Sequence, residues 1–194
     1  MALRLKYPVI LASASPRRQE LLKRLIPEFA VVPAEVDEEA HTHEDPYVTA
    51  QGLARRKAFE VFERHPNSLV IGGDTVVAFE EAGSWTQLAK PTDVDDAVRM
   101  LTLLAGRTHL VVTGMALRWP RGMHAFTAAS NVTFRPLNDA EIRAYVATGE
   151  PMDKAGAYGI QGMAKGFLER LEGSVDTVIG MPIEPLEEAL KDVK

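Results

Sequence analysis

Several kinds of residue and motif are missing from this sequence. It has no cysteine, which excludes disulfides, zinc–thiolate sites and thiol nucleophiles. No apolar run approaches the ~18 residues of a membrane span, and the short apolar start, broken by Pro8, is not typical of a signal peptide. The 22 lysines and arginines are outnumbered by 27 acidic residues, which gives a formal net charge of -5. We therefore expect a cytoplasmic chain with neither a membrane nor a nucleic acid as a stable partner.

Common motifs of hydrolases and nucleotide-binding proteins are also absent. The sequence contains no G-x-S-x-G elbow, no H-E-x-x-H, no G-x-G-x-x-G and no P-loop. His41 and His43 form an H-x-H pair, but no clear third and fourth zinc ligands accompany them. We interpret this pair as part of a solvated loop.

The residues that are present indicate one folded domain over residues 1–194. Short apolar runs bounded by turn formers predict strands, and serine, asparagine and proline at characteristic positions predict helix starts. The expected strands are 9–12, 29–32, 69–71, 76–79, 110–119, 128–134, 167–171 and 177–179. Helices are expected to begin near Pro16, Pro46, Val94, Asn138 and Pro185. Because helices and strands mix irregularly, the fold class is α/β with a mixed sheet.

The segment SASPRR, from Ser13 to Arg18, is the first candidate site. A predicted strand leads directly into a helix, with Ser15 as N-cap and Pro16 at the first helical position. Unpaired N–H groups and partial positive charge gather at such a helix start. Together with Arg17 and Arg18 they suit a phosphate group. The alternative is that the serine only caps the helix and both arginines are solvated.

Two acidic segments could supply carboxylates to a site. Asp74, in GGDTVV, follows two glycines between apolar runs, so we expect it at a strand end or bulge. EVDEE, from Glu35 to Glu39, offers oxygen ligands of the kind that Mg²⁺ or Mn²⁺ prefers. The alternatives are an Asx-turn at Asp74 and a solvated acidic loop at EVDEE.

Two lysines are further candidates, Lys57 on the helix from Pro46 and Lys90 in LAKP. A lone lysine is usually a surface residue, so these two are candidate ligands only if both reach the same phosphate. The glycine-rich segment DKAGAYGIQG, from Asp153 to Gly162, allows close backbone approach to a ligand. Within it, Tyr158 and Gln161 could stack on or hydrogen-bond to a base. The alternative is a simple glycine-rich turn.

Taken together, these segments resemble the Maf family of nucleoside triphosphate pyrophosphatases. The resemblance spans nearly the whole chain and follows the family's order of motifs. It rests on LASASPRRQELL from Leu11, EVDEE from Glu35, LARRKA from Leu53, GGDTVV from Gly72, AKP from Ala89, VTFRPL from Val132, DKAGAYGIQG from Asp153 and VIGMP from Val178.

The family resemblance implies a mixed, twisted sheet with flanking helices in two lobes around a cleft, often as a homodimer. It implies hydrolysis of a nucleoside triphosphate to monophosphate and pyrophosphate with a divalent metal, Mg²⁺ or Mn²⁺. By position, Asp74 and Glu38 match the catalytic and metal-binding residues. The residues that match the phosphate-binding set are Ser13, Arg18, Lys57 and Lys90.

Arg17, Thr75 and Gln161 resemble the family branch that acts on dTTP and UTP. The resemblance thus implies a role in nucleotide-pool sanitation that includes modified pyrimidine nucleotides. One alternative is the branch that acts on 7-methyl-GTP, in which other residues stand at these three positions. The other is a non-catalytic nucleotide-binding regulator of cell division and septum formation, which need not retain Glu38 and Asp74.

Overall fold

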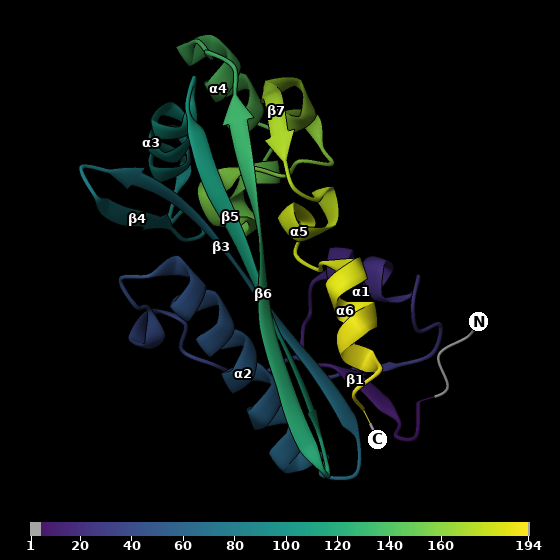
Figure 1. Ribbon diagram of the computed structural model, residues 1–194. Coiled ribbons are helices and arrows are strands. Elements are labelled where there is room, and N and C mark those ends of the chain that lie inside the picture. Colours follow the sequence, from purple (N-terminus) through teal and green to yellow (C-terminus); the bar gives the residue numbers. More distant parts are fainter. Residues whose placement is uncertain (1–4, 194) are drawn as a thin grey trace. The chain divides into compact units, whose positions relative to one another are not determined.

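The computed structural model describes residues 5–193 (Figure 1). The chain divides into two compact units, which we describe separately. Unit 1 comprises the described residues up to Thr75, Thr113–Ala128 and the chain from Gly180 on. Unit 2 comprises Val76–Val112 and Ala129–Ile179.

The strands confirm the expected mixed sheet. Its order is β2-β1-β3-β5-β6-β7, with β4 beside β3. Strand β1 is parallel to both β2 and β3, whereas β4 is antiparallel to β3 and β7 is antiparallel to β6. The strands are β1 (Val9–Leu11), β2 (Ala30–Val31), β3 (Leu69–Glu81), β4 (Ser84–Leu88), β5 (Thr108–Trp119), β6 (Gly122–Phe134) and β7 (Leu168–Glu172).

Unit 1 combines the parallel strands with α-helices whose starts the sequence predicts near Pro16, Pro46 and Pro185. Its helices are α1 (Pro16–Leu22), the short 3₁₀ helix η1 (Glu39–His41), α2 (Pro46–Arg64) and α6 (Ile183–Leu190). The Ser15 hydroxyl accepts a hydrogen bond from the Arg18 N–H, and Pro16 occupies the first turn of α1. Apolar residues of α2 pack on β1, β3 and β5 in a cluster of small side chains: Ile10, Ala12, Ala54, Ala58, Val61, Val70 and Ala116.

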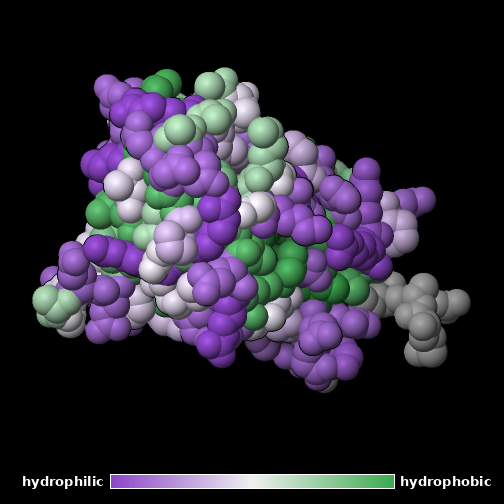
Figure 2. All heavy atoms as spheres, turned by 90° about the horizontal axis from the view of Figure 1, so that it is seen from above, coloured by the Kyte–Doolittle hydropathy of each residue, from purple (hydrophilic) through white to green (hydrophobic). Residues whose placement is uncertain are grey.

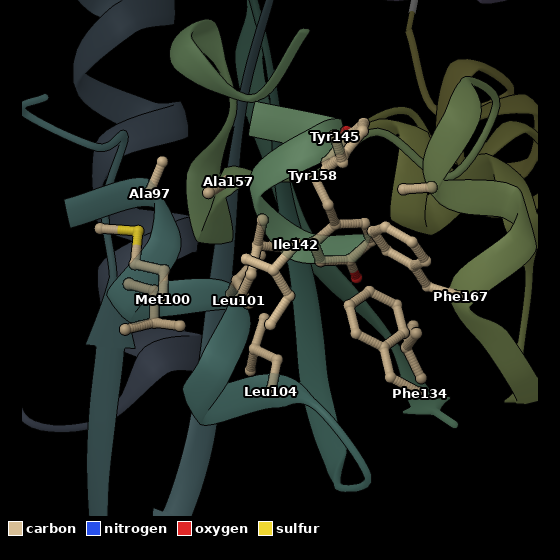
Figure 3. Packing of buried hydrophobic residues seen from close by; sticks show 14 of the residues in the cluster. Ala97, Met100, Leu101, Leu104, Phe134, Ile142, Tyr145, Ala157, Tyr158 and Phe167 are labelled. Carbon is tan, nitrogen blue, oxygen red and sulfur yellow. The ribbon is translucent and has the colours of Figure 1, made fainter. Parts of the chain in front are cut away.

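Unit 2 has the larger aromatic core (Figure 3). Helices α3 (Val94–Leu104) and α4 (Asp139–Val146) are followed by the 3₁₀ helices η2 (Glu150–Asp153), η3 (Ala155–Ala157) and η4 (Met163–Phe167), and by α5 (Val175–Ile179). The rings of Phe134, Tyr158 and Phe167 meet edge to face, an arrangement that aromatic quadrupoles favour. The capping box predicted at Asn138 and Glu141 is present at the start of α4.

Two details of the expected elements are wrong. The interruption between 69–71 and 76–79 is absent, because Gly72 and Gly73 continue the extended backbone of one strand, β3, and do not turn it. Residues 177–179 lie in helix α5 rather than in a strand. There the Ser174 hydroxyl accepts the Asp176 N–H, and the Ser174 carbonyl accepts the Val178 N–H. These local bonds at the helix start outweigh the weak strand preference of a β-branched run.

Across residues 5–193, no helix is both long and apolar enough to cross a membrane. Hydrophilic residues cover much of the face shown in Figure 2, with smaller apolar patches between them.

Candidate active site

Two glycines allow helix α2 to lie directly on the strands of unit 1. A Cβ at Gly72 would lie 2.4 Å from the Ala54 carbonyl oxygen, and one at Gly114 would lie 2.2 Å from the Ala50 carbonyl oxygen. Neither contact is tolerable, so a larger residue at either position would displace the helix. This close approach of α2 to β3 brings the Lys57 side chain to Asp74.

Lys57 joins two carboxylates from separate elements. Its Nζ donates to Asp74 Oδ1 and to Glu38 Oε1, both at 2.6 Å. The Lys57 and Asp74 side chains are only 12% and 9% exposed, whereas Glu38 is 48% exposed. The carboxylates of Glu38 and Asp74 thus converge on a single cation position, with one side protected and the other open to water.

The electrostatic environment of Asp74 suits a proton acceptor. Burial raises the pKa of the Asp74 carboxyl above its ordinary value. The positive charges of Lys57 and Arg18 oppose that increase without cancelling it. A general base works best when its pKa lies near the operating pH, so this shift is in the useful direction.

Arg18 is held by three hydrogen bonds from its guanidinium group. Nε donates to the Gly180 carbonyl at 2.9 Å, Nη1 to Ser13 Oγ at 3.3 Å and Nη2 to Thr75 Oγ1 at 3.0 Å. Burial lowers the pKa of Arg18, but a guanidinium keeps its charge in proteins. Ser13, Arg18 and Thr75 therefore form one ordered cationic corner in unit 1.

Sequence reasoning did not identify two residues that complete this corner. The Thr113 hydroxyl is buried and lies 2.9 Å from the Thr75 hydroxyl. Gly180 has φ +114°, and a Cβ there would lie 2.9 Å from Thr75 Oγ1. The VIGMP segment around Gly180 was the available signal, but its sequence carries no chemistry of its own.

The remaining predicted residues are more dispersed. Arg17 is half-buried on α1 in unit 1, whereas Lys90 and Gln161 are exposed in unit 2. The Gly156 N–H donates to the Ala89 carbonyl at 3.1 Å, so the Lys90 segment lies against the glycine-rich segment within unit 2. The predicted site residues thus belong to two sets, one in each unit.

Tyr158 does not fit the suggested role of stacking on a base. It is 6% exposed, and its hydroxyl lies 2.8 Å from His109 Nε2. Figure 3 shows its ring inside the aromatic core beside Phe134 and Phe167. The correct interpretation is a core tyrosine, because a ring packed on all sides offers no face to a ligand.

The acidic loop contributes Glu38 to the site, whereas Asp37 bonds within the loop itself. Asp37 Oδ1 accepts the Ala40 N–H at 3.2 Å, and the Asp37 carbonyl lies 2.8 Å from His41 Nδ1. His43 Nδ1 accepts the Asp45 N–H at 3.0 Å. These bonds agree with a loop role for the H-x-H pair and leave Glu38 as the side chain of EVDEE that reaches Lys57.

The donor set fits a weakly coordinated divalent cation. Residues 5–193 contain no group of three or more histidine, cysteine, aspartate or glutamate side chains that could enclose a metal. Mg²⁺ commonly binds through one or two carboxylates and completes its shell with water and substrate phosphates. Asp74 and Glu38, which already share one cation, match that requirement.

The α/β fold is shared with a protein of known structure. The chain superimposes on the structure of the Staphylococcus aureus Ham1 protein with a TM-score of 0.55, covering 96% of this chain and 100% of that one at 14% identity. At this identity the likeness concerns the fold alone.

The family follows from the sequence comparisons. Residues 8–193 match the family described as Maf-like protein, and the chain belongs to this family. It is 43% identical over 186 residues to the dTTP/UTP pyrophosphatase of Geobacillus sp. (strain WCH70), covering 96% of each chain. It is 47% identical over 175 residues to the dTTP/UTP pyrophosphatase of Koribacter versatilis (strain Ellin345), covering 90% of this chain and 89% of the relative. The resemblance seen in the motifs is thus confirmed.

Proposed function

We propose that this chain hydrolyses dTTP and UTP to the monophosphate and pyrophosphate, and that it removes unwanted pyrimidine nucleotides, modified ones included, from the cytoplasmic pool. The observation that carries the proposal is the convergence of Asp74 and Glu38 on Lys57, within a chain whose relatives are named dTTP/UTP pyrophosphatases. Two carboxylates beside fixed cations suit hydrolysis of a phosphoanhydride better than passive binding of a nucleotide.

Asp74 is the proposed proton acceptor. A water molecule at its carboxylate gives up a proton and attacks the α-phosphorus. The bond from that phosphorus to the oxygen bridging the α- and β-phosphates breaks, and pyrophosphate leaves with the electron pair. Asp74 and Glu38 would hold Mg²⁺ or Mn²⁺, which supplies charge neutralisation on the phosphate oxygens and polarisation of the phosphorus.

The cations bind and orient the polyphosphate. Ser13, Arg18, Lys57 and Lys90 are the proposed phosphate ligands. The bonds from Arg18 to Gly180 and Thr75 fix its guanidinium before substrate arrives, so little ordering entropy remains to be lost on binding. Fixed positive charge at the phosphates supplies most of the acceleration in transfers of this kind.

Gln161, Thr75 and Arg17 are the proposed specificity residues. The uracil or thymine edge presents acceptor, donor and acceptor groups, and the Gln161 amide carries both a donor and an acceptor. Thr75 already accepts a hydrogen bond from Arg18, which supports an effect of Thr75 through the guanidinium.

A nucleotide panel tests the proposal. Purified protein is assayed with UTP, dTTP, CTP, GTP and 7-methyl-GTP in Mg²⁺ or Mn²⁺, and pyrophosphate and orthophosphate are measured separately. We expect UMP and pyrophosphate from UTP, with UTP and dTTP preferred by about 10- to 100-fold over the other nucleotides. UDP and orthophosphate as first products would refute the bond assignment, and equal rates on all five would refute the specificity.

Metal dependence and assembly are tested separately. Chelation should abolish hydrolysis without lowering the melting temperature, because Lys57 pairs with both carboxylates when no metal is bound. The family resemblance also implies a homodimer, and light scattering, which measures the mass of the particle in solution, tests it. Activity that survives exhaustive chelation would remove Glu38 and Asp74 from the metal-binding role.

A further inference from the structure

The loop that carries Gln161 is fastened on both sides of that residue. Gln161 is exposed, and it lies between Gly159 and Met163, each of which makes a backbone contact to a side chain from elsewhere in unit 2. Those side chains are Tyr145, near the end of α4, and Glu150, at the start of η2. Neither carries any role in the proposed hydrolysis.

Tyr145 and Glu150 act together through one short chain of hydrogen bonds. The Tyr145 hydroxyl donates to Glu150 Oε1 at 3.0 Å and accepts the Gly159 N–H at 3.1 Å. The other carboxylate oxygen, Glu150 Oε2, accepts the Met163 N–H at 3.2 Å. The tyrosine is 3% exposed and belongs to the aromatic core, so the chain of bonds begins at a rigid point (Figure 3).

The glycines beside Gln161 are explained by this same carboxylate. A Cβ at Gly162 would lie 2.0 Å from Glu150 Oε1, although the φ of Gly162, -91°, is open to any residue. A Cβ at Gly159 would lie 2.8 Å from Lys154 Cε and 3.3 Å from Glu150 Oε1. The Lys154 ammonium in turn donates to the Glu150 carbonyl at 2.5 Å. The loop is therefore packed closely around Glu150.

We propose that Tyr145 and Glu150 are positioning residues that set base specificity by fixing the backbone on either side of Gln161. The inference rests on the proposed role of Gln161 in base recognition. A side-chain amide can present its donor and acceptor in either order and so can suit uracil or cytosine. An anchored backbone restricts the positions from which the amide reaches the base, and a loose loop lets it adapt to both.

The test compares discrimination between bases in matched variants. Tyr145→Phe removes the hydroxyl that links Glu150 to the Gly159 N–H, and Glu150→Gln leaves one carbonyl oxygen where two acceptors are needed. The ratio of kcat/KM for UTP to that for CTP is measured in each variant and in Gln161→Ala. Glu141→Gln makes the same chemical change on α4, at a carboxylate that accepts from the Asn138 N–H and from Arg135 rather than from Gly159 or Met163.

We expect Tyr145→Phe and Glu150→Gln to lower the UTP-to-CTP ratio by about tenfold, mainly through the KM for UTP. Glu141→Gln should preserve the ratio. The double variant Tyr145→Phe with Gln161→Ala should have the ratio of Gln161→Ala alone, because the two residues act on one interaction.

Other results would overturn the inference. If Gln161→Ala lowers the ratio but Tyr145→Phe and Glu150→Gln slow all nucleotides equally, the pair is structural and the role of Gln161 stands. If Gln161→Ala leaves the ratio unchanged, base recognition by Gln161 fails and the positioning role fails with it, while hydrolysis itself is unaffected by that result. Should both variants prove unfolded by circular dichroism, Gly162→Ala provides the test. It keeps the buried tyrosine, displaces the Glu150 carboxylate and should lower the ratio, so an unchanged ratio in folded Gly162→Ala would refute the inference.

Discussion

Lys57 and Asp74 form a buried ion pair in which Nζ lies 2.6 Å from Oδ1, and the ammonium extends the pair to the exposed Glu38. A buried carboxylate is costly unless it is paired. The lysine therefore makes it possible for Asp74 to remain buried inside β3. The same contact ties helix α2 to the carboxylates that we propose for catalysis.

Removal of the Asp74 charge should abolish most of the activity. We expect Asp74→Asn to lower kcat by about 10²-fold or more, the scale of general-base catalysis, and Glu38→Gln to act in the same direction. Steady-state assays with saturating metal measure both. Glu60→Gln, which affects only the ion pair with Arg64 on the outside of α2, is the matched control. Unchanged turnover in Asp74→Asn would refute its role as proton acceptor.

The raised pKa of Asp74 predicts a particular dependence of stability on pH. Between the ordinary pKa of 3.8 and the raised folded-state pKa of Asp74, the folded chain retains a proton that the unfolded chain has released. The stabilisation by this group is therefore complete below pH 3.8 and is lost as the pH rises through the folded-state pKa. We expect the unfolding free energy of the native chain, relative to Asp74→Asn, to fall with increasing pH in that interval, by up to about 1.4 kcal/mol per pH unit. Urea unfolding at several pH values measures this difference, and a difference that rises with pH would contradict the assignment.

The buried His109 ring predicts that the free energy of unfolding rises with pH in the acid range, opposite to the effect of Asp74. Burial lowers its pKa from 6.5 to about 3, and no hydrogen-bond partner within residues 5–193 meets its Nδ1. Stability from the neutral ring is complete above pH 6.5 and is lost as the pH falls toward 3. We expect His109→Gln to flatten this loss and the exposed His43→Gln to retain it, as measured by urea unfolding between these pH values. If the free energy of unfolding falls equally with decreasing pH in both variants, His109 is not the group responsible and the prediction is wrong.

Gly72 and Gly52 provide a paired test of how α2 approaches β3. Gly72→Ala would place a Cβ 2.4 Å from the Ala54 carbonyl oxygen, so we expect about 1–3 kcal/mol of destabilisation and a large loss of activity as Lys57 moves from Asp74. Gly52 lies in α2 itself, where a Cβ would meet nothing within 4 Å beyond the backbone of its own helix. Gly52→Ala should therefore stabilise the chain by about 0.5–1 kcal/mol and retain activity. Thermal unfolding and UTP hydrolysis measure both variants, and similar behaviour of the two would refute the close-packing explanation.

The sequence identified the chemistry of the candidate site better than its arrangement. Asp74, Glu38, Lys57, Arg18 and Ser13 all stood out by residue type and motif. Unit 1 joins them in two hydrogen-bonded groups, Lys57 with Asp74 and Glu38, and Arg18 with Ser13. Asp74 was expected at a strand end or a bulge, and the strand end was wrong, because β3 continues past it. A pair of glycines beside a carboxylate favours a turn when only local propensity is considered. In this fold Gly72 is needed because helix α2 lies on the strand.

What the sequence by itself determined is local: the starts of α1 and α4, fixed by Ser15, Pro16 and Asn138, and the apolar run that became β1. These features depend on neighbouring residues, whose backbone groups a single side chain can cap or bury. Only the tertiary structure decided that Arg18 would bond to Gly180, 162 residues away, and that Tyr158 would enter the core. Such contacts depend on which backbones pack closely enough to meet, and that is a property of the whole fold rather than of any segment.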